Sequence, residues 1–333
     1  MTPKVSVIIP VYNPGDSFHK CVKSLLAQTL EKIELIFVLD CPTDGSDKVI
    51  EEYALKHRQI IIIKNQYNLN IGRSRNVGLY AAKGDYVAFC DHDDIVKPFM
   101  YKEMAELANK TNADIVLGVP EYIYDDSTLN QTYYYPSYNE DLRTKLLSLI
   151  IGMDNDESQW AFYISHGVIW DKLYNRSFLL ENNIEFVDNN KITFEDNLFN
   201  IETLNFAKKI SLYNEPVYQH VINGLNTASS YVYSKYDRVS GYINYLFNKL
   251  HEYGIFEQYK VRFYNSVVMY ITGAFVIEIK RNWSNPVKLF SSIRYLKKNR
   301  IIRESFCGCT MRPSSKSIMR RIVLLFINML FKI

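Results

Sequence analysis

The sequence lacks the marks of a disulfide-rich, zinc-binding or membrane-spanning protein. Its cysteines form no even set of pairs, and Cys307 and Cys309 make a lone C-x-C without the further ligands of a structural zinc site. No stretch reaches the roughly 18 apolar residues of a membrane span, and no signal peptide is recognisable. We therefore expect a cytoplasmic protein with reduced thiols. The five cysteines are Cys21, Cys41, Cys90, Cys307 and Cys309.

Positive charge is unevenly placed along the chain and is in excess only near its end. From Glu278 to Ile333 the sequence has 13 Lys or Arg and 2 Glu, so this segment carries +11 and the preceding residues carry −8. Such asymmetry indicates a basic end that meets an anionic partner. Nucleic acid is not the expected partner, because the basic residues belong to no recognised nucleic-acid-binding module.

The last residues, 316–333, form a basic and then strongly apolar run. On a helix, Arg321, Asn328 and Lys332 would share one side and the other faces would be apolar. We expect this tail to lie in the interface of an anionic membrane, which places the protein on the inner face of the cell membrane. Docking of the helix on the protein core or in a homodimer is the alternative.

Apolar runs that suit buried strands alternate with segments of helical spacing over the first 90 residues. The runs are residues 5–12, 33–39, 60–64 and 86–90, and the helical segments are 17–28, one ending near residue 57, and 73–82. This order predicts an α/β fold with a doubly wound sheet. Ligands of such sheets bind at the carboxyl ends of the strands, where Asp40 and Asp91 lie.

The later part of the sequence has a less regular pattern. Helical spacing dominates beyond residue 231, which predicts a mainly helical C-terminal region. Between residues 100 and 231, we expect a helix after Met100, a strand at 114–119, a loop or hairpin over 122–138, helices at 142–151 and 195–207, and a strand at 217–221.

Three carboxylates occupy four positions at Asp91-His92-Asp93-Asp94. Like charges this close repel one another, so the arrangement costs stability unless a cation joins it. Carboxylate oxygens are hard ligands, which favour Mg²⁺ or Mn²⁺. An exposed acidic turn is the alternative, but the position directly after a buried strand favours a metal site.

Over residues 5–94 the sequence resembles the family 2 inverting glycosyltransferases with the GT-A fold. The segments that carry the resemblance are 5–13 (VSVIIPVYN), Asp40 with 43–46 (TDGS), Asn70, Gly72, 73–78 (RSRNVG) and 84–94 (GDYVAFCDHDD). The resemblance implies a GT-A type mixed sheet. It implies a nucleotide-sugar half at residues 1–120, an acceptor half at 121–230 and a helical region at 231–333.

The resemblance also implies roles for donor-site residues. Pro10 and Tyr12 would flank the nucleobase, and Asp40 would accept a hydrogen bond from a uracil N–H. The family usually has two acidic residues there, but Leu39 replaces the first, which weakens any inference about the base. The remaining donor-binding residues would be Asn70, Gly72, Arg75 at the base or diphosphate, Asp91 at the ribose, and His92, for which an exposed bystander is the alternative.

The metal and the reaction fall to other residues. By the same resemblance, Asp93 would hold the metal that bridges the two phosphates, and His220 would join it unless it is a structural histidine. Asp196 would be the catalytic base, with Glu195 as the other candidate. Carboxylates capping a helix N-terminus are the alternative for this pair. His166 and Trp170 would line the acceptor site, although a core position for Trp170 is equally compatible with the sequence.

The sequence thus predicts an inverting hexosyl- or N-acetylhexosaminyltransferase. It would move a sugar from a nucleotide sugar, which we expect to be a UDP-sugar, to a lipid-linked saccharide in capsule, lipopolysaccharide or exopolysaccharide synthesis. A catalytically inactive membrane-associated scaffold is one alternative, against which Asp91, Asp93 and Asp196 argue. A nucleotidyltransferase is the other, but it would need a Gly-rich basic loop after the first strand, and residues 13–16 (NPGD) are not one.

Overall fold

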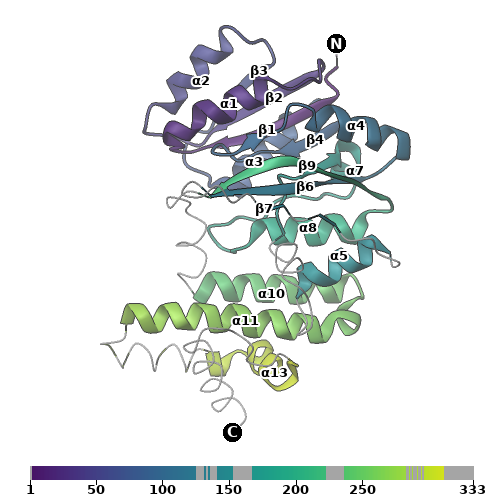
Figure 1. Cartoon of the computed structure of the whole chain (residues 1–333). Coiled ribbons are helices and arrows are strands. Elements are labelled where there is room, and N and C mark those ends of the chain that lie inside the picture. Colours follow the sequence, from purple (N-terminus) through teal and green to yellow (C-terminus); the bar gives the residue numbers. More distant parts are fainter. Residues whose placement is uncertain are drawn as a thin grey trace. The chain divides into compact units, whose positions relative to one another are not determined.

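The computed structural model describes residues 2–124, 131–132, 134–135, 141–152, 167–222, 236–282, 285, 287, 291, 294 and 296–310 (Figure 1). The chain divides into two compact units, each assembled from separate segments. Unit 1 comprises Met1–Arg143, Val168–Asn189 and Glu202–Asn226, and unit 2 comprises Thr144–Gly167, Asn190–Ile201 and Thr227–Ile333. The functional division at residues 120 and 230 therefore stays a prediction. His166 and the tail at 316–333 lie outside the described residues.

One half of the unit 1 sheet is parallel, with the strand order β3-β2-β1-β4. Every residue of β1 and β2 is buried, which explains their continuous apolar runs. The strands are β1 Val5–Val11, β2 Ile33–Leu39, β3 Ile60–Lys64 and β4 Tyr86–Phe89, and the connecting elements are η1 Gly15–Ser17, α1 Phe18–Leu26, α2 Ser46–Ala54 and α3 Ile71–Ala81.

The other half of the sheet continues in the order β8-β6-β9-β5, with β7 paired to β6. Strand β8 is antiparallel to both β4 and β6, whereas β9 is parallel to β6. These elements are β5 Ile95–Val96, α4 Met100–Thr111, β6 Ile115–Tyr124, β7 Gln131–Thr132, β8 Lys172–Asn175, α7 Arg176–Glu181 and β9 Ile210–Ile222. The predicted mixed, doubly wound sheet is confirmed, while β8 and the first half of β9 were not predicted.

Helix α3 approaches β1 closely because Gly78 has no side chain. A Cβ atom at Gly78 would lie 2.4 Å from Cγ2 of Ile8, a distance that real Cβ contacts do not reach. Gly72, in the first turn of the same helix, lies against the backbone of residues 186–189, where a Cβ would be 2.8 Å from the carbonyl oxygen of Val187. Both glycines of the motif therefore fix where α3 packs.

The described parts of unit 2 are helical. They include α5 Leu142–Ile151 from Thr144 onward, α8 Glu195–Phe206 as far as Ile201, α10 Tyr236–Glu252, α11 Phe256–Asn282 and α13 Arg300–Gly308. Helix α11 packs against α10 and α13, and the missing side chain at Gly308 admits the ring of Tyr264. Within the described residues, no helix combines the length and the apolar character needed to cross a membrane.

Candidate functional site

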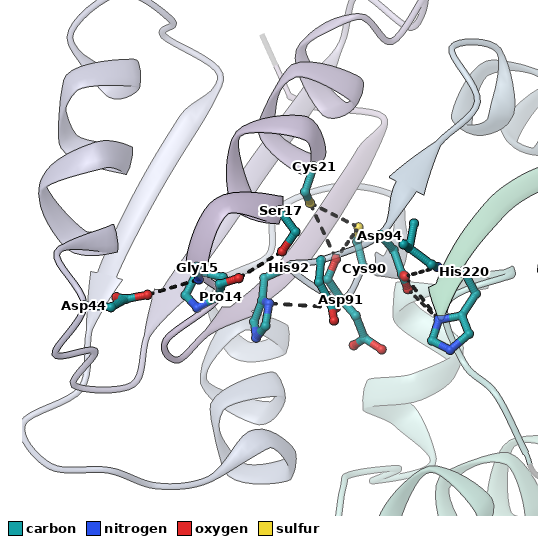
Figure 2. A network of polar contacts seen from close by, with 12 residues as sticks. Pro14, Gly15, Ser17, Cys21, Asp44, Cys90, Asp91, His92, Asp94 and His220 are labelled. Atoms are coloured by element: carbon teal, nitrogen blue, oxygen red, sulfur yellow. Dashed lines mark hydrogen bonds and ion pairs between the residues drawn. The ribbon is translucent and has the colours of Figure 1, made fainter. Parts of the chain in front are cut away.

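Asp91 to Asp94 follow β4 after one intervening residue, Cys90, and form a turn at the carboxyl end of the parallel strands (Figure 2). The Cys90 amide donates to the carbonyl of Ile8, so the pairing of β4 with β1 continues to the start of the turn. The amide of Asp91 donates to the Tyr218 hydroxyl of β9 at 3.1 Å. The turn therefore begins from a fixed backbone rather than from a free loop.

Asp91 forms an ion pair with Arg75 of helix α3. The Arg75 Nη2 lies 3.0 Å from Oδ1 of Asp91, and the Arg75 side chain is only 1% exposed while that of Asp91 is 26% exposed. The guanidinium also lies 5.3 Å from the centre of the Phe186 ring. In this structure Arg75 is therefore directed at Asp91, which retains an exposed part. The donor contacts predicted for the two residues stay predictions.

Asp94 is fully buried and turned towards β9. Its Oδ2 accepts a hydrogen bond from the Tyr218 hydroxyl at 2.8 Å, and its Oδ1 accepts one from the Val221 amide at 2.9 Å. Nδ1 of His220 lies 3.1 Å from each carboxylate oxygen. Burial raises the pKa of Asp94, although the hydrogen bond and charge of His220 oppose that shift.

Asp93 keeps a partly exposed side chain, and its pKa is raised by burial and by the neighbouring carboxylates. Burial, followed by the charges of Asp94 and Asp91, raises its pKa to about 6, while His92 acts in the opposite direction. Nδ1 of His92 lies 3.8 Å from Asp93 Oδ1. An accumulation of negative charge that is costly to ionise is a place where a cation would be favourable.

No set of three or more His, Cys, Asp or Glu side chains among the described residues is arranged to hold a metal by itself. Mg²⁺ and Mn²⁺ sites of nucleotide enzymes commonly use one or two carboxylates and take their other ligands from phosphates and water. The oxygen donors of Asp91 and Asp93 fit such an open site, whereas they do not form a closed one.

Aromatic rings hold His220 in place. The Trp170 ring stacks on Tyr218 with centroids 4.4 Å apart and on His220 with centroids 5.3 Å apart. Tyr122 meets both Trp170 and His220 edge-on. Because Trp170 is only 4% exposed, the structure favours a core role for this residue over the acceptor wall that the resemblance implied.

Asp40 organises the loop between β3 and α3. It is buried, and its carboxylate accepts hydrogen bonds from the Asn65 side chain at 2.7 Å and from the Leu69 and Asn70 amides at 2.7 and 2.8 Å. Asn70 itself has a left-handed φ of 66°. Asp40 therefore shapes this loop, and its predicted contact with a uracil N–H stays a prediction.

The loops after β1 and β2 are tied to each other. Oδ1 of Asn13 accepts a hydrogen bond from the Thr43 amide at 2.7 Å, and Asp44 accepts one from the Gly15 amide at 3.1 Å (Figure 2). Pro10 is buried in β1, whereas the Tyr12 side chain is 49% exposed. An exposed aromatic ring can stack on a planar base, and the nucleobase contacts of Pro10 and Tyr12 stay predictions.

Two thiols pack behind the acidic turn. Sγ of Cys21 in α1 lies 4.0 Å from Sγ of Cys90, and both residues are buried. Each thiol also faces the Asp91 carbonyl, at 3.5 Å and 3.3 Å respectively. Burial raises the pKa of Cys90 well above its ordinary value, so this thiol stays neutral beside the turn.

The candidate bases lie in unit 2, in the first turn of α8. The preceding residue, Phe194, has a left-handed φ of 60°, an unusual conformation for a bulky side chain. Its ring packs 5.1 Å from Tyr242 and 4.4 Å from Tyr270. The left-handed turn directs the chain into Glu195 and Asp196, and such backbone cost is characteristic of functional sites.

Sequence reasoning gave no role to Tyr218 or Asp94. Tyr218 bridges the turn, because its hydroxyl accepts from the Asp91 amide and donates to Asp94. The available signal was weak. Tyr218 and His220 are two positions apart, so they share one face of the predicted strand. The sequence does not show that this strand pairs with β6, where Tyr122 is the partner of His220.

The sequence profile described as Glycosyl transferase family 2 matches residues 6–168. The glycosyltransferase EpsJ of Bacillus subtilis, described as uncharacterized, is 32% identical over 219 residues, which cover 66% of this chain and 61% of that protein. A poly(ribitol-phosphate) beta-glucosyltransferase of Bacillus spizizenii is 28% identical over 69% of this chain and 34% of that protein. The match therefore spans less than two thirds of these two relatives.

A solved structure extends the comparison over nearly the whole chain. Residues 1–349 of S. aureus TarS, in complex with UDP-GlcNAc, superpose with a TM-score of 0.69 at 19% identity, covering 99% of this chain and 91% of that one. This likeness confirms the fold, and the relatives confirm the resemblance inferred from residues 5–94. Residues 6–168 thus match the profile of glycosyl transferase family 2, and the chain is similar in sequence to proteins described as glycosyltransferases.

Proposed function

We propose that the chain is an inverting glycosyltransferase that moves a sugar from a UDP-sugar to a saccharide acceptor. The observation that carries this proposal is the crowding of three carboxylates at the end of β4, where burial and neighbouring charge raise the pKa of Asp93 to about 6. The TarS structures hold UDP-GlcNAc or UDP, which supports a UDP-sugar as the donor. The sugar itself is a hexose or an N-acetylhexosamine.

The metal-binding part of the proposal assigns Mn²⁺ or Mg²⁺ to Asp93, with His220 as the second protein ligand and the diphosphate and water as the others, while Asp91 would contact the ribose. A divalent metal bound there would stabilise the negative charge that grows on the diphosphate as it leaves. Asp91 is held by Arg75 at 3.0 Å, so the protein pre-positions a carboxylate before the donor arrives. Tyr12 and Asp40 would hold the uracil, and Asn70, Gly72 and His92 would complete the donor pocket.

The reaction is a single displacement in which Asp196 accepts the proton. The acceptor hydroxyl oxygen forms a bond to the anomeric carbon while the bond from that carbon to the diphosphate oxygen breaks. The electron pair leaves with the nucleoside diphosphate, and the hydroxyl proton moves to the Asp196 carboxylate. Glu195 is the alternative base. General base catalysis of this kind contributes roughly 10²–10⁴-fold to rate.

We propose a lipid-linked saccharide of a cell-surface polysaccharide as the acceptor. One relative acts on poly(ribitol-phosphate), by its name, which supports a polymer or its precursor as the substrate class. His166 stays a candidate acceptor ligand. Such an acceptor would be met at the cytoplasmic face of the membrane.

A basic surface near the end of the described chain supports membrane association. Five exposed Lys or Arg side chains lie on or just before α13, and of these Arg300 pairs with Glu304 at 2.6 Å. Helix α13 itself carries Arg300 and Arg303 and packs on α11. Clusters of four to eight basic residues are typical of surfaces that bind anionic lipids. The five are Arg294, Lys297, Lys298, Arg300 and Arg303.

The donor proposal is tested by calorimetric titration of the full chain with UDP and with UDP-sugars in the presence and absence of Mn²⁺. We expect saturable binding that requires Mn²⁺, together with slow hydrolysis or transfer for one sugar of the panel. A chain that binds no uridine diphosphate with Mn²⁺ would contradict the proposal. Binding without turnover in any acceptor extract would instead favour the inactive scaffold.

Membrane association is tested by co-sedimentation with anionic and zwitterionic vesicles. The triple variant Lys297→Gln/Lys298→Gln/Arg303→Gln should bind anionic vesicles about 100-fold more weakly, since each basic residue near such a surface contributes about 1 kcal/mol. The matched control is Lys48→Gln/Lys102→Gln/Lys110→Gln, which removes three exposed charges of unit 1. If both variants lose the same affinity for anionic vesicles, or if the wild type binds zwitterionic vesicles equally well, this surface does not bind anionic lipids.

A further inference from the structure

Asp94 differs from the two carboxylates before it in that its oxygens are already engaged inside the protein. Three donors converge on it: the Tyr218 hydroxyl, the Val221 amide and Nδ1 of His220. It is fully buried, so it is poorly suited to bind a metal or a phosphate-linked ligand directly. Its position next to Asp93 nevertheless connects the acidic turn to β9.

The contact with Asp94 determines where the proton of neutral His220 lies. An ionised carboxylate only accepts hydrogen bonds, and Nδ1 of His220 is 3.1 Å from both of its oxygens. Nδ1 must therefore carry the hydrogen. In the neutral ring the lone pair is then on Nε2, the nitrogen on the other side of the ring.

The plane of the imidazole is fixed as well as its tautomer. Trp170 stacks on it with an interplanar angle of 15°, and Tyr122 meets it at 84° with centroids 5.7 Å apart. Tyr218 lies under the same Trp170 ring and donates to Asp94. Ring orientation and carboxylate position are thus held by one cluster, which consists of Asp94, Tyr122, Trp170, Tyr218 and His220.

We propose that Asp94 is a positioning residue for His220, holding the Nδ1–H tautomer so that the ring offers Nε2 to the metal of the donor site. The proposal rests on the metal-dependent donor site described above. Carboxylates that hydrogen-bond a metal-ligating histidine commonly set its tautomer, and their loss typically weakens metal affinity 10- to 100-fold. It also gives Trp170 a purpose, since the stacked ring restrains His220.

The decisive variant is Asp94→Asn. The amide keeps the shape of the side chain and one acceptor oxygen, but it replaces the other oxygen by an NH₂ donor facing Tyr218 and His220. Because Nδ1 lies 3.1 Å from both carboxylate oxygens, the new NH₂ group competes with the remaining oxygen for Nδ1. Where the NH₂ donates to the ring, the lone pair is on Nδ1 and the hydrogen moves to Nε2. The matched control is Glu121→Gln, the same change at a partly buried carboxylate of β6 that pairs with Gln219 and Lys97.

Two measurements on the full chain separate the proposal from its premise. Long-range ¹H–¹⁵N spectra of histidine-labelled protein, at a pH where the ring is neutral and with His220→Gln for assignment, report the tautomer without metal. We expect Nδ1–H in the wild type and in Glu121→Gln, and a large Nε2–H population in Asp94→Asn. Titration with Mn²⁺ in the presence of UDP should then show binding weakened 10- to 100-fold in Asp94→Asn alone.

Each outcome is informative. An Nε2–H tautomer in the wild type overturns the proposal even if Asp94→Asn fails to fold. An unchanged tautomer or unchanged Mn²⁺ affinity in folded Asp94→Asn overturns it as well. If the wild type has the Nδ1–H tautomer but binds no Mn²⁺ with UDP, the proposed metal-dependent donor site is wrong. The role proposed for Asp94 is then wrong as well.

Discussion

The chain leads into the carboxylates at the end of β4 and into those at the start of α8 in different ways. In unit 1, Asp91 and Asp94 accept charged and neutral hydrogen bonds from Arg75, His220, Tyr218 and a backbone amide. In unit 2, Glu195 and Asp196 follow a left-handed Phe194 whose ring packs between Tyr242 and Tyr270. Hydrogen bonds and an ion pair fix the turn after β4. The Phe194 ring, which we call the aromatic anchor, fixes the turn that precedes Glu195.

This difference suggests a division of labour. A site that must accept a diphosphate and a cation benefits from carboxylates whose positions are set in advance, because their mutual repulsion would otherwise spread them apart. A base acts on one proton, and its requirement is correct placement rather than accumulated charge. Binding and turnover should therefore respond differently to changes in the two regions.

The largest effect is expected from Asp196→Asn. Loss of the base should lower kcat by about 10³-fold, within the roughly 10²–10⁴-fold that general base catalysis contributes, while the Kd for UDP with Mn²⁺ stays unchanged. Steady-state transfer assays and calorimetry measure the two quantities. Glu195→Gln is the neighbouring control and should retain most of the activity. If Glu195→Gln is instead the inactive variant, the roles of the two residues are reversed.

Asp93→Asn should produce the opposite pattern in unit 1. The change removes a metal-binding charge, so Mn²⁺-dependent binding of UDP should be lost along with about 10²-fold in transfer rate. Asp85→Asn is a suitable control, because Asp85 is an exposed carboxylate just before β4 and pairs with Lys4 at 3.0 Å. If UDP binding to Asp93→Asn still depends on Mn²⁺, Asp93 does not bind the metal, and the proposed difference between the two regions is wrong.

The smallest effect is expected from Phe194→Gly. Glycine adopts the left-handed conformation without cost, which offsets part of the loss of the two ring contacts, each worth about 0.5–1.5 kcal/mol. Thermal stability should therefore change little, whereas kcat should fall about tenfold as the turn before Asp196 loosens, less than the 10²-fold caused by a 1 Å misplacement.

The control for Phe194→Gly is Asn183→Gly, which replaces another left-handed residue, in the turn after α7 of unit 1. This variant should leave both kcat and the Kd for UDP as in the wild type. A Phe194→Gly enzyme with full kcat would show that the aromatic anchor has no part in placing the candidate base.

The parallel half of the sheet could be predicted because its signals are local. Residues 33–39 and 60–64 form continuous apolar runs whose predicted bounds match β2 and β3, and Asp40 and Asp91 follow strands whose carboxyl ends share an edge. Strand β8 was missed because it has four residues and is defined by antiparallel pairing with β4 and β6, far away in sequence. The arrangement of Trp170 over His220 also depends on such pairing.

The same limit applies to the site. The motif at 91–94 identified which residues carry negative charge, but not that one of them faces inwards. That distinction is made by β9, more than 120 residues later in the chain, through the Val221 amide and the Tyr218 hydroxyl. Pattern and spacing cannot reveal contacts that exist only after the sheet has assembled.

Because segments of the two units alternate along the chain, some contacts of unit 1 can form only late in translation. Residue Val221, which donates to Asp94, is separated from it by 127 positions, and two segments of unit 2 are translated in between. At roughly 5–20 residues per second, the ribosome needs about 6–25 s to make that stretch. During this interval Arg75 can already pair with Asp91, but the partners of Asp94 on β9 have not yet been made. Until β9 emerges, the Asp94 carboxylate meets only water, soluble ions or chaperones.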